Sequence, residues 1–575
     1  MAGTRQHGPR DGGSEIESRR GADGGDARAG TTDEPDGADE RIELVAEPIR
    51  YRRTPLAALL VVALIPAIGL YVLTRWADGR ADEYEASRDA LAAAERRAPD
   101  PGLLEPDLEG SIDDALTGAP TPGVGDDTSI DDEPVGVDAG SALLDTRVFD
   151  YRRAPDAIAT IVAARRLAAE VEPVFAFLDP TSCAAVSASG VTVASFNADV
   201  PVIPASVQKL VVAAVALDVL GPDHRFATSV AVPPPLDGEV AGDVFLIGGG
   251  DPLLTSDDFP ILDDPRPAFG TTSLDVLADA VVAAGVTRIR GSVIGDGTRY
   301  DDEFVVDTWG EGIAGVDAGP YDALLVNDAR VRGISSRLDD PNEAAAREFV
   351  RLLGERGIVV DTGWGSGAAS TLVPVVGTVE SEPLATVVAE MLTTSDNNTA
   401  EMLLKELGVV AQGNGSRAAG LAVLRDRLTA WGIDLDGITL VDGSGLSTGN
   451  RLTCAAVLEL LQRFRGTALD AGLAVAGRSG TLLDEFTESP VLGRLRAKTG
   501  TLSNQPFDVD PPAVKALAGY VDADTDSALE FVVIANSADV SEPTRYRPLW
   551  SAFGDRFATY PDGPGSSDLR PSVDG

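Results

Sequence analysis

Ser206 and Lys209 stand three residues apart at the start of an apolar segment that runs to residue 220. In a helix, positions i and i+3 share one face, so the serine hydroxyl and the lysine amine can meet there. The first turn of a helix also carries unpaired backbone N–H groups, which favour a developing negative charge. A serine becomes a nucleophile when a neighbouring base takes its proton. The spacing therefore predicts a nucleophile and its base, although a serine at a helix start is more often only an N-cap.

Two distant segments could complete this site. Residues 395–397 (Ser-Asp-Asn) lie between two predicted helices, where these residue types by themselves indicate an ordinary turn. Residues 498–501 (Lys-Thr-Gly-Thr) lie on a predicted strand, and the glycine allows a backbone or a substrate to approach closely. The order Ser-x-x-Lys, Ser-x-Asn and Lys-Thr-Gly in one chain makes coincidence a poor explanation.

Residue counts favour lysine chemistry over histidine chemistry. Lysine occurs at only four positions, Lys209, Lys405, Lys498 and Lys515, and two of these belong to the motifs. Arginine, which is used almost everywhere else, cannot be deprotonated and so cannot act as a base. The chain has only 2 histidines. They leave almost no candidates for a multi-histidine metal site or for the histidine of a Ser-His-Asp triad. We therefore expect no metal and no organic cofactor.

The three motifs together are the signature of β-lactamases and penicillin-binding proteins. Their surroundings resemble the low-molecular-mass penicillin-binding proteins that act as D-Ala-D-Ala carboxypeptidases and endopeptidases. The supporting segments are Gly248-Gly249-Gly250-Asp251-Pro252, Asp442-Gly443-Ser444-Gly445-Leu446-Ser447 and Gly480-Thr481-Leu482. The chain between the first two motifs is far longer than a compact β-lactamase needs, and the family carries an inserted domain there. The resemblance covers about residues 150–560.

The resemblance implies the fold. We expect an α/β fold of the penicillin-binding-protein and β-lactamase type, with a large inserted domain between the first two motifs. Its antiparallel sheet, flanked by helices, would be assembled from both ends of the chain. The five expected strands lie near Val174, Val191, Arg496, Leu517 and Leu529.

The resemblance also implies the catalytic roles. Ser206 attacks the carbonyl of a D-Ala-D-Ala peptide and forms an acyl-enzyme. Lys209 is its general base, with a pKa lowered by burial and by the nearby Lys498. Ser395 relays a proton to the leaving amine, while Asn397 holds the substrate amide and the lysine side chain.

Substrate binding is implied for the third motif. Thr499 and Thr501, together with Lys498, bind the terminal carboxylate of the peptide or of a β-lactam, and Gly500 lets the ligand come close to the strand. The backbone N–H groups of Ser206 and Thr501 form the oxyanion hole. Residues 503–513 form an extra loop after this motif that could narrow or cover the cleft.

The implied partners are peptidoglycan stem peptides, with β-lactam antibiotics as inhibitors. A β-lactamase is an alternative, but the long insertion and the lack of an evident deacylating glutamate segment between the first two motifs count against it. A catalytically silent wall-binding protein is a second alternative, against which the intact motifs argue. The sequence leaves the preference between chain ends and cross-links open.

The N-terminal part predicts a membrane anchor. Residues 1–53 are polar and rich in Gly, Asp and Arg, as in a disordered tail. Residues 54–75 contain an uncharged apolar run that, at about 1.5 Å per residue, crosses a bilayer. A cleaved signal peptide is the alternative, which the long preceding tail disfavours. Arginines are denser before the span, so we expect a cytoplasmic tail and a single-pass plasma-membrane protein with an extracytoplasmic catalytic domain.

Composition also predicts the domain boundaries in the rest of the chain. We predict an acidic linker at 76–150, a catalytic domain at 151–229 and 377–560, an inserted domain at 230–376 and a disordered tail at 561–575. The formal net charge of −44 disfavours nucleic acid as a partner. Cys183 and Cys454 are the only cysteines, and they permit either one disulfide or two separate buried thiols.

Apolar periodicity predicts the regular elements. Strand-like runs occur at 174–178, 191–196, 243–247, 288–295, 517–521 and 529–536. Helices are predicted at 155–170, 206–220, 274–284, 342–356, 384–392, 398–407, 418–431 and 453–464.

Overall fold

The computed structural model describes residues 155–562, apart from 260–267, 311, 335, 504–511 and 523–527. The predicted N-terminal tail, membrane anchor and acidic linker lie outside the described residues, as does most of the loop expected after the third motif. Among the residues that are described, no helix is both long and apolar enough to cross a membrane.

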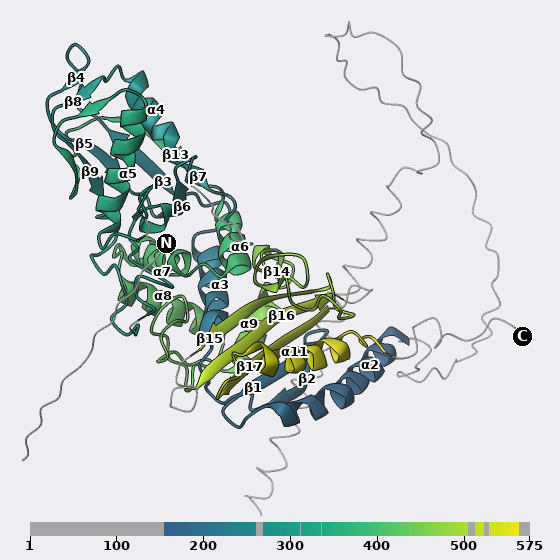
Figure 1. Ribbon diagram of the computed structural model, residues 1–575. Helices are drawn as coiled ribbons and strands as arrows, with labels where there is room; N and C mark the ends of the chain where they lie inside the picture. The colour runs from purple at the N-terminus through teal and green to yellow at the C-terminus, as the bar shows by residue number, and fades with distance from the viewer. Residues whose placement is uncertain are drawn as a thin grey trace, which may run out of the picture. The chain divides into compact units, whose positions relative to one another are not determined.

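A six-stranded antiparallel sheet is built from both ends of the described chain, in the order β14-β15-β16-β17-β1-β2 (Figure 1). The first two strands join the last ones, because β1 pairs with β17. This confirms the expected fold class. The strands are β1 (Cys183–Ala188), β2 (Val191–Phe196), β14 (Ala474–Val475), β15 (Leu495–Leu502), β16 (Ala513–Asp522) and β17 (Ala528–Ser537).

Two details of the predicted sheet are wrong. The run near Val174 is not a strand but a 3-10 helix, η2 (Glu172–Phe177), whose first turn contains a proline that favours helical entry. The first strand is β1 instead. Its small residues, Cys, Ala and Ser around one Val, carry little strand propensity, so the pattern did not reveal it. The sixth strand is the two-residue β14, which is too short to show a periodicity.

Helices cover both faces of this sheet. Successive strand residues point to opposite faces, so Val532 joins one buried cluster and Val533 the other. Helices α2 (Pro155–Val171) and α11 (Pro543–Phe557) lie on one face (Figure 1). Helix α11 was not predicted, because Pro548 and Gly554 interrupt its helical pattern. The other face packs against α3 (Lys209–Val219) and α9 (Cys454–Phe464).

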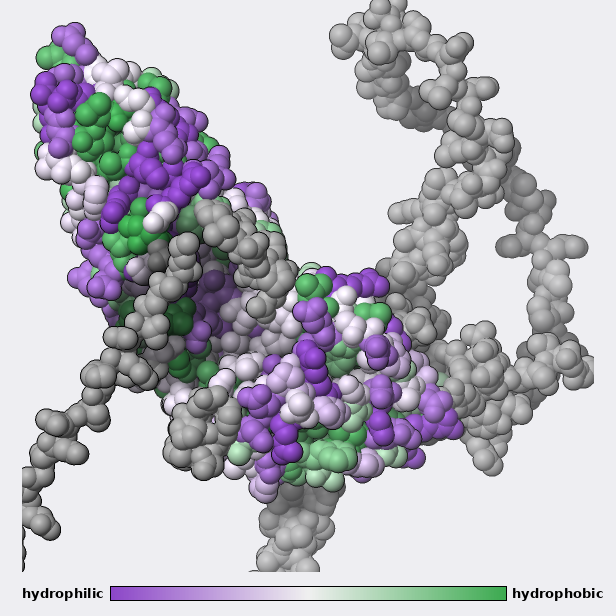
Figure 2. All heavy atoms as spheres, in the orientation of Figure 1, coloured by the Kyte–Doolittle hydropathy of each residue, from purple (hydrophilic) through white to green (hydrophobic). Residues whose placement is uncertain are grey.

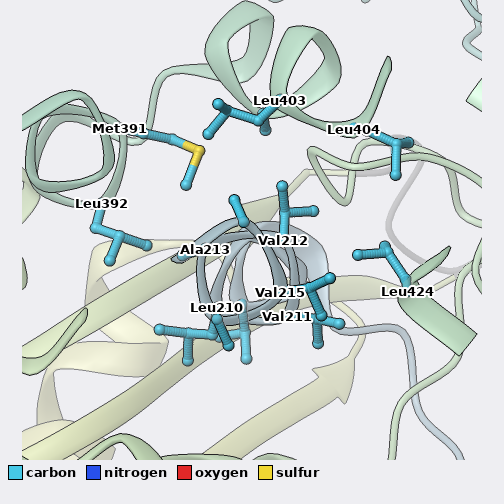
Figure 3. Close-up of a cluster of buried hydrophobic side chains, with 14 of the residues drawn as sticks. Leu210, Val211, Val212, Ala213, Val215, Met391, Leu392, Leu403, Leu404 and Leu424 are labelled. Atoms are coloured by element: carbon cyan, nitrogen blue, oxygen red, sulfur yellow. The ribbon is translucent and has the colours of Figure 1, made fainter. Parts of the chain in front are cut away.

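Helix α3 is buried along its whole first part. Every residue from Lys209 to Leu217 is buried, which explains why its sequence is apolar on all sides. Figure 3 shows α3 enclosed by side chains such as Met391, Leu403 and Leu424. These side chains come from α6 (Leu384–Thr394), α7 (Asn397–Gln412) and α8 (Arg417–Ala430).

The inserted segment has a core of its own. Its main sheet has the order β12-β9-β5-β3-β13 and packs against α4 (Asp275–Ala283) and α5 (Pro341–Glu355). The predicted run at 288–295 is two strands, β8 (Arg288–Ile289) and β9 (Ser292–Asp296). The other strands are β3 (Ala227–Ala231), β4 (Glu239–Val240), β5 (Val244–Ile247), β6 (Asp251–Thr255), β7 (Thr272–Ser273), β10 (Leu324–Val326), β11 (Val359–Val360), β12 (Gly363–Ser366) and β13 (Val375–Glu380). Three further short helices are η4 (Asn327–Ala329), α10 (Ala468–Ala471) and η5 (Gly480–Leu482).

The two cysteines form a disulfide. Cys183 at the start of β1 is bonded to Cys454 at the start of α9, with a Cα–Cα distance of 5.9 Å. The structure thus decides between the two possibilities that the sequence left open. Outside the core, Figure 2 shows hydrophilic residues spread over the visible face, with hydrophobic residues in separate patches.

Candidate active site

The nucleophile motif forms the turn that opens α3. A short 3-10 helix, η3 (Ala205–Gln208), runs directly into α3. Ala205 has φ +48°, an uncommon conformation for a residue with a Cβ, and such backbone strain is typical of functional sites. Ser206 follows it and is only partly buried, whereas Lys209 is fully buried. The distance from Lys209 Nζ to Ser206 Oγ is 3.0 Å.

The Lys209 amine is held by three acceptors. It donates to Ser206 Oγ, to Asn397 Oδ1 at 2.6 Å and to the Ser444 carbonyl at 2.7 Å. An ammonium has three N–H donors, so all of its protons are bound. When the amine loses a proton, two of these acceptors still orient it, and its lone pair can face Ser206.

Burial lowers the pKa of Lys209 from 10.5 to about 8. The carboxyl groups of Asp396, Asp442 and Glu401 oppose this, since each raises the pKa of the lysine. Burial under α6, α7 and α8 is therefore the main cause of the lowering, as expected from the sequence, while the contribution expected from Lys498 stays a prediction. A pKa near 8 leaves a useful fraction of neutral amine at neutral pH.

The second motif lies between two helices. Ser395 ends α6 with φ +71°, and Asp396 caps α7 by accepting the Thr399 N–H at 2.5 Å. This cap places Asn397 on the first turn of α7, where its amide reaches in two directions. Its Oδ1 accepts from Lys209, and its Nδ2 donates to the Asp317 carbonyl at 2.9 Å.

The third motif lies on β15. Lys498 is fully buried, and its Nζ donates to Ser395 Oγ at 2.7 Å, so the second serine also has a lysine partner. The Thr499 hydroxyl bonds Thr481 Oγ1 at 2.8 Å. A Cβ at Gly500 would lie 3.0 Å from the carbonyl oxygen of Pro204. The glycine therefore lets β15 pack directly against the turn that carries the nucleophile.

A cleft of about 410 Å³ opens over these groups. It is lined by side chains of all three motifs, while the amines of Lys209 and Lys498 lie buried beneath it. The structure thus brings every predicted site residue into one region, although their catalytic roles stay a prediction. The lining residues are Ser206, Ile313, Asp317, Thr394, Ser395, Asn397, Leu446, Thr481, Thr499, Thr501, Leu502 and Ser503.

Sequence reasoning missed several supporting groups. The Ser444 carbonyl is fixed because Glu401 accepts the N–H groups of Gly443 and Ser444 at 2.7–3.1 Å. A Cβ at Gly445 would lie 1.9 Å from the Ala205 carbonyl oxygen, so this loop presses against the nucleophile turn. The sequence of this segment supports the family resemblance but does not indicate a role for its backbone.

The side chain of Lys515 was also missed. It donates to Thr501 Oγ1 at 3.0 Å from the neighbouring strand. The rarity of lysine was the available signal.

This arrangement supports acyl transfer by a serine that has a lysine as its base. The site and the sheet topology together define the class of penicillin-recognising serine enzymes. In the described part of the chain, no group of three or more His, Cys, Asp and Glu side chains is placed to hold a metal ion.

Comparison with known proteins specifies the family. The profile of the D-Ala-D-Ala carboxypeptidase 3 (S13) family matches residues 181–332 and 323–551, more than half of the chain. The D-alanyl-D-alanine carboxypeptidase of Actinomadura sp. (strain R39) is 30% identical over 436 residues, covering 61% of this chain and 76% of that protein. A carboxypeptidase of Mycobacterium tuberculosis is 31% identical over 356 residues, covering 59% of this chain and 72% of that protein.

A solved structure supports the fold. Penicillin-binding protein 4 of Haemophilus influenzae aligns with a TM-score of 0.55 at 19% identity, covering 67% of this chain and 97% of that protein. The chain described here belongs to the S13 family of D-Ala-D-Ala carboxypeptidases. It is accordingly a serine-type peptidase with a penicillin-binding-protein fold and an inserted domain.

Proposed function

We propose that this protein hydrolyses the D-Ala-D-Ala bond in peptidoglycan stem peptides through an acyl-enzyme on Ser206, and that β-lactams acylate the same serine. The contact between the buried Lys209 amine and Ser206 Oγ carries this proposal. It supplies a nucleophile with a base of suitable pKa in one turn of the chain.

The proposed reaction has two steps. Neutral Lys209 takes the proton of Ser206 as its oxygen attacks the peptide carbonyl. As the C–N bond breaks, Lys209 passes this proton through Ser395, which Lys498 contacts at 2.7 Å, to the leaving amine and becomes neutral again. Water next attacks the ester carbonyl and gives its proton to Lys209, which returns it to the Ser206 oxygen as the ester bond breaks and the acid is released.

The proposed substrate contacts are made by residues that line the cleft. The terminal carboxylate lies at the hydroxyls of Thr499 and Thr501, and Asn397 holds the peptide amide. The N–H groups of Ser206 and Thr501 stabilise the oxyanion, and one such donor contributes about 3–4 kcal/mol in comparable enzymes.

Covalent labelling by fluorescent penicillin tests the nucleophile. The wild-type ectodomain should be labelled stably, and Ser206→Ala should not be labelled at all. Ser195→Ala, an exposed serine on β2, is the control and should label like the wild type. Labelling of Ser206→Ala would exclude this serine as the nucleophile. Rapid steady turnover of nitrocefin in place of a stable adduct would instead indicate β-lactam hydrolysis.

The location is part of the proposal. An anchor at residues 54–75 would hold the catalytic domain at the outer face of the plasma membrane, where its substrate lies. Protease added to intact cells should digest the catalytic domain and leave the N-terminal tail. Protection of the catalytic domain would mean the opposite orientation.

A further inference from the structure

A second pocket adjoins the active-site cleft. It has a volume of about 320 Å³ and shares Thr481, Thr499 and Thr501 with the cleft. Its other walls include Lys515 of β16 and Arg547 of α11. Because the shared threonines are the proposed binding site of the terminal carboxylate, the second pocket begins where a substrate with a single terminal D-alanine ends.

Lys515 is held firmly in the wall of this pocket. It lies opposite Thr501 in the β15–β16 pairing and donates to the threonine hydroxyl at 3.0 Å. Its Nζ lies 4.0 Å from the ring centroid of Tyr546 and 4.9 Å from that of Trp550. The ammonium therefore makes cation–π contacts with two aromatic rings.

Among the described residues the Lys515 ammonium has no ion-pair partner, although the Glu485 carboxylate lies near enough to raise its pKa. Glu485 is matched by Arg547 Nη2 at 3.1 Å and by the Tyr546 hydroxyl at 2.7 Å. Within the described ranges, no carboxylate lies within ion-pair distance of Lys515 Nζ. Burial lowers the pKa of Lys515 to about 8, so the amine is still largely protonated at neutral pH.

We propose that this pocket is a leaving-group subsite for a D-amino acid whose side chain bears a second carboxylate, and that Lys515 donates a hydrogen bond to this group. The proposal rests on the function proposed above. The α-carboxylate of the leaving residue binds Thr499 and Thr501, and its acidic side chain passes over them to Lys515. A peptide cross-link with an acidic residue on its amine side would release a leaving group of this kind. The subsite therefore favours anionic leaving groups over plain D-alanine.

Matched peptides test the subsite. We would measure kcat/KM for acyl-D-Ala-D-Glu and acyl-D-Ala-D-Gln, which have the same shape and differ in one charge. The wild type should prefer D-Glu by about tenfold, the value of one charge-assisted hydrogen bond. Lys515→Gln should bring the ratio of the two kcat/KM values near one, because it removes the charge that distinguishes the two peptides. Arg545→Gln removes the same charge from α11 outside the pocket and should keep the wild-type ratio.

The pH dependence of the same ratio tests the subsite without any variant. As the pH rises through about 8, Lys515 loses its proton and the preference for D-Glu should vanish. The base Lys209 affects both peptides equally and cancels in the ratio. Asp484, Glu485, Tyr546 and Arg547 are the other titratable groups that line the pocket. Of these, Glu485 raises the pKa of Lys515 and Arg547 lowers it.

Three outcomes would overturn the subsite. A D-Glu preference that survives in Lys515→Gln would mean that another group binds the anion. An equal loss on D-Glu, D-Gln and D-Ala peptides would mean that Lys515 only positions Thr501. A wild type that cleaves acyl-D-Ala-D-Ala without distinguishing D-Glu from D-Gln would refute the subsite alone. Failure on every peptide together with failure to bind penicillin would refute the proposed function.

Discussion

The catalytic region and the inserted segment use positive charge in different ways. All four lysines lie in the catalytic region, and residues 230–376 contain arginines but no lysine. In the cleft, Lys209 and Lys498 are fully buried and contact hydroxyl, amide and carbonyl oxygens. Lys405 is a buried lysine that instead pairs with Asp301 at 2.7 Å.

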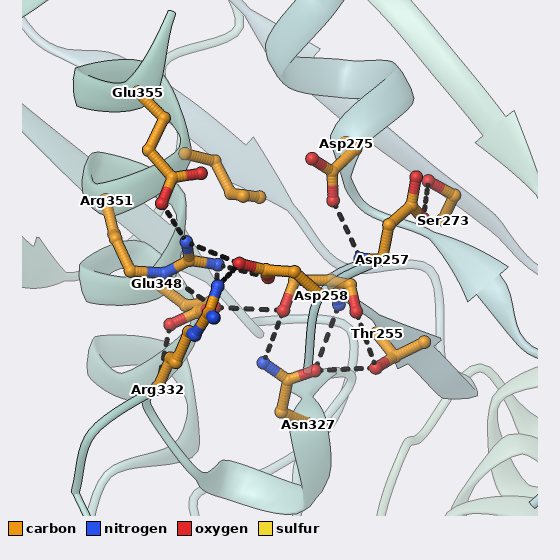
Figure 4. A network of polar contacts seen from close by, with 12 residues as sticks. Thr255, Asp257, Asp258, Ser273, Asp275, Asn327, Arg332, Glu348, Arg351 and Glu355 are labelled. Atoms are coloured by element: carbon orange, nitrogen blue, oxygen red, sulfur yellow. Dashed lines mark hydrogen bonds and ion pairs between the residues drawn. The ribbon is translucent and has the colours of Figure 1, made fainter. Parts of the chain in front are cut away.

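The inserted segment surrounds its arginines with carboxylates. Figure 4 shows Arg351 of α5 among Asp258, Glu348 and Glu355, with Arg332 beside it. Arg351 reaches these three carboxylates at 2.6–2.8 Å, and Glu348 is fully buried. A guanidinium stays protonated and offers five donors in a fixed plane, which suits a permanent cross-link between loop and helix.

The difference follows from what each region must do. A base has to change its protonation state, so it needs an amine whose pKa burial can bring near neutral. A structural link must not change its state, so it needs a guanidinium with carboxylate partners. The comparison predicts that replacing a cleft lysine by arginine lowers catalytic activity. Loss of an arginine in the inserted segment should lower only the stability of the fold.

The largest effect is expected from Lys209→Arg. The positive charge is kept, but an arginine cannot accept the proton of Ser206, so penicillin acylation should fall by about 10³-fold or more. Stopped-flow acylation rates measure this. Arg351→Lys in the inserted segment is the matched control and should acylate at the wild-type rate. Substantial activity in Lys209→Arg would rule out the lysine as base.

The second effect is on stability. Arg351→Ala removes the partner of buried Glu348, which would keep only the Ser256 hydroxyl at 2.9 Å and the Arg332 N–H at 3.0 Å. We expect a loss of about 2–4 kcal/mol in the free energy of unfolding, measured in urea. The acylation rate of the folded variant should stay unchanged. A slower rate at unchanged stability would show that the network acts on the active site.

The third effect is the pH dependence of acylation. Below about pH 8 the neutral fraction of Lys209 grows about tenfold per pH unit, so the rate should rise with that slope and level off above pH 8. Asp396→Asn should move the midpoint to lower pH, because Asp396 raises the pKa of Lys209 and asparagine caps a helix equally well. A rate that is flat between pH 6 and about pH 9 would contradict the base role.

The cluster at the active site could be predicted because the motifs carry the reacting side chains themselves. Groups that act through their backbone could not, since any residue type supplies a carbonyl like those of Ser444 and Asp317. The fold class was predictable, but η2 near Val174 was not, because an apolar run of this length suits either a strand or a helical turn. Helix α11 was missed because packing against the sheet outweighs the cost of Pro548.

The smallest effect is expected where an arginine pair of the inserted segment is open to solvent. Arg288 contacts Asp361 at 2.8 Å, and their side chains are 41% and 26% exposed. Water and salt screen such a pair, so Arg288→Gln should change the free energy of unfolding by about 0–1 kcal/mol, with any loss disappearing at high salt. Arg351→Ala, measured beside it, should keep its larger loss in salt because Glu348 is buried. If both variants lost the same stability, burial of the carboxylate would not be what makes the Arg351 network strong.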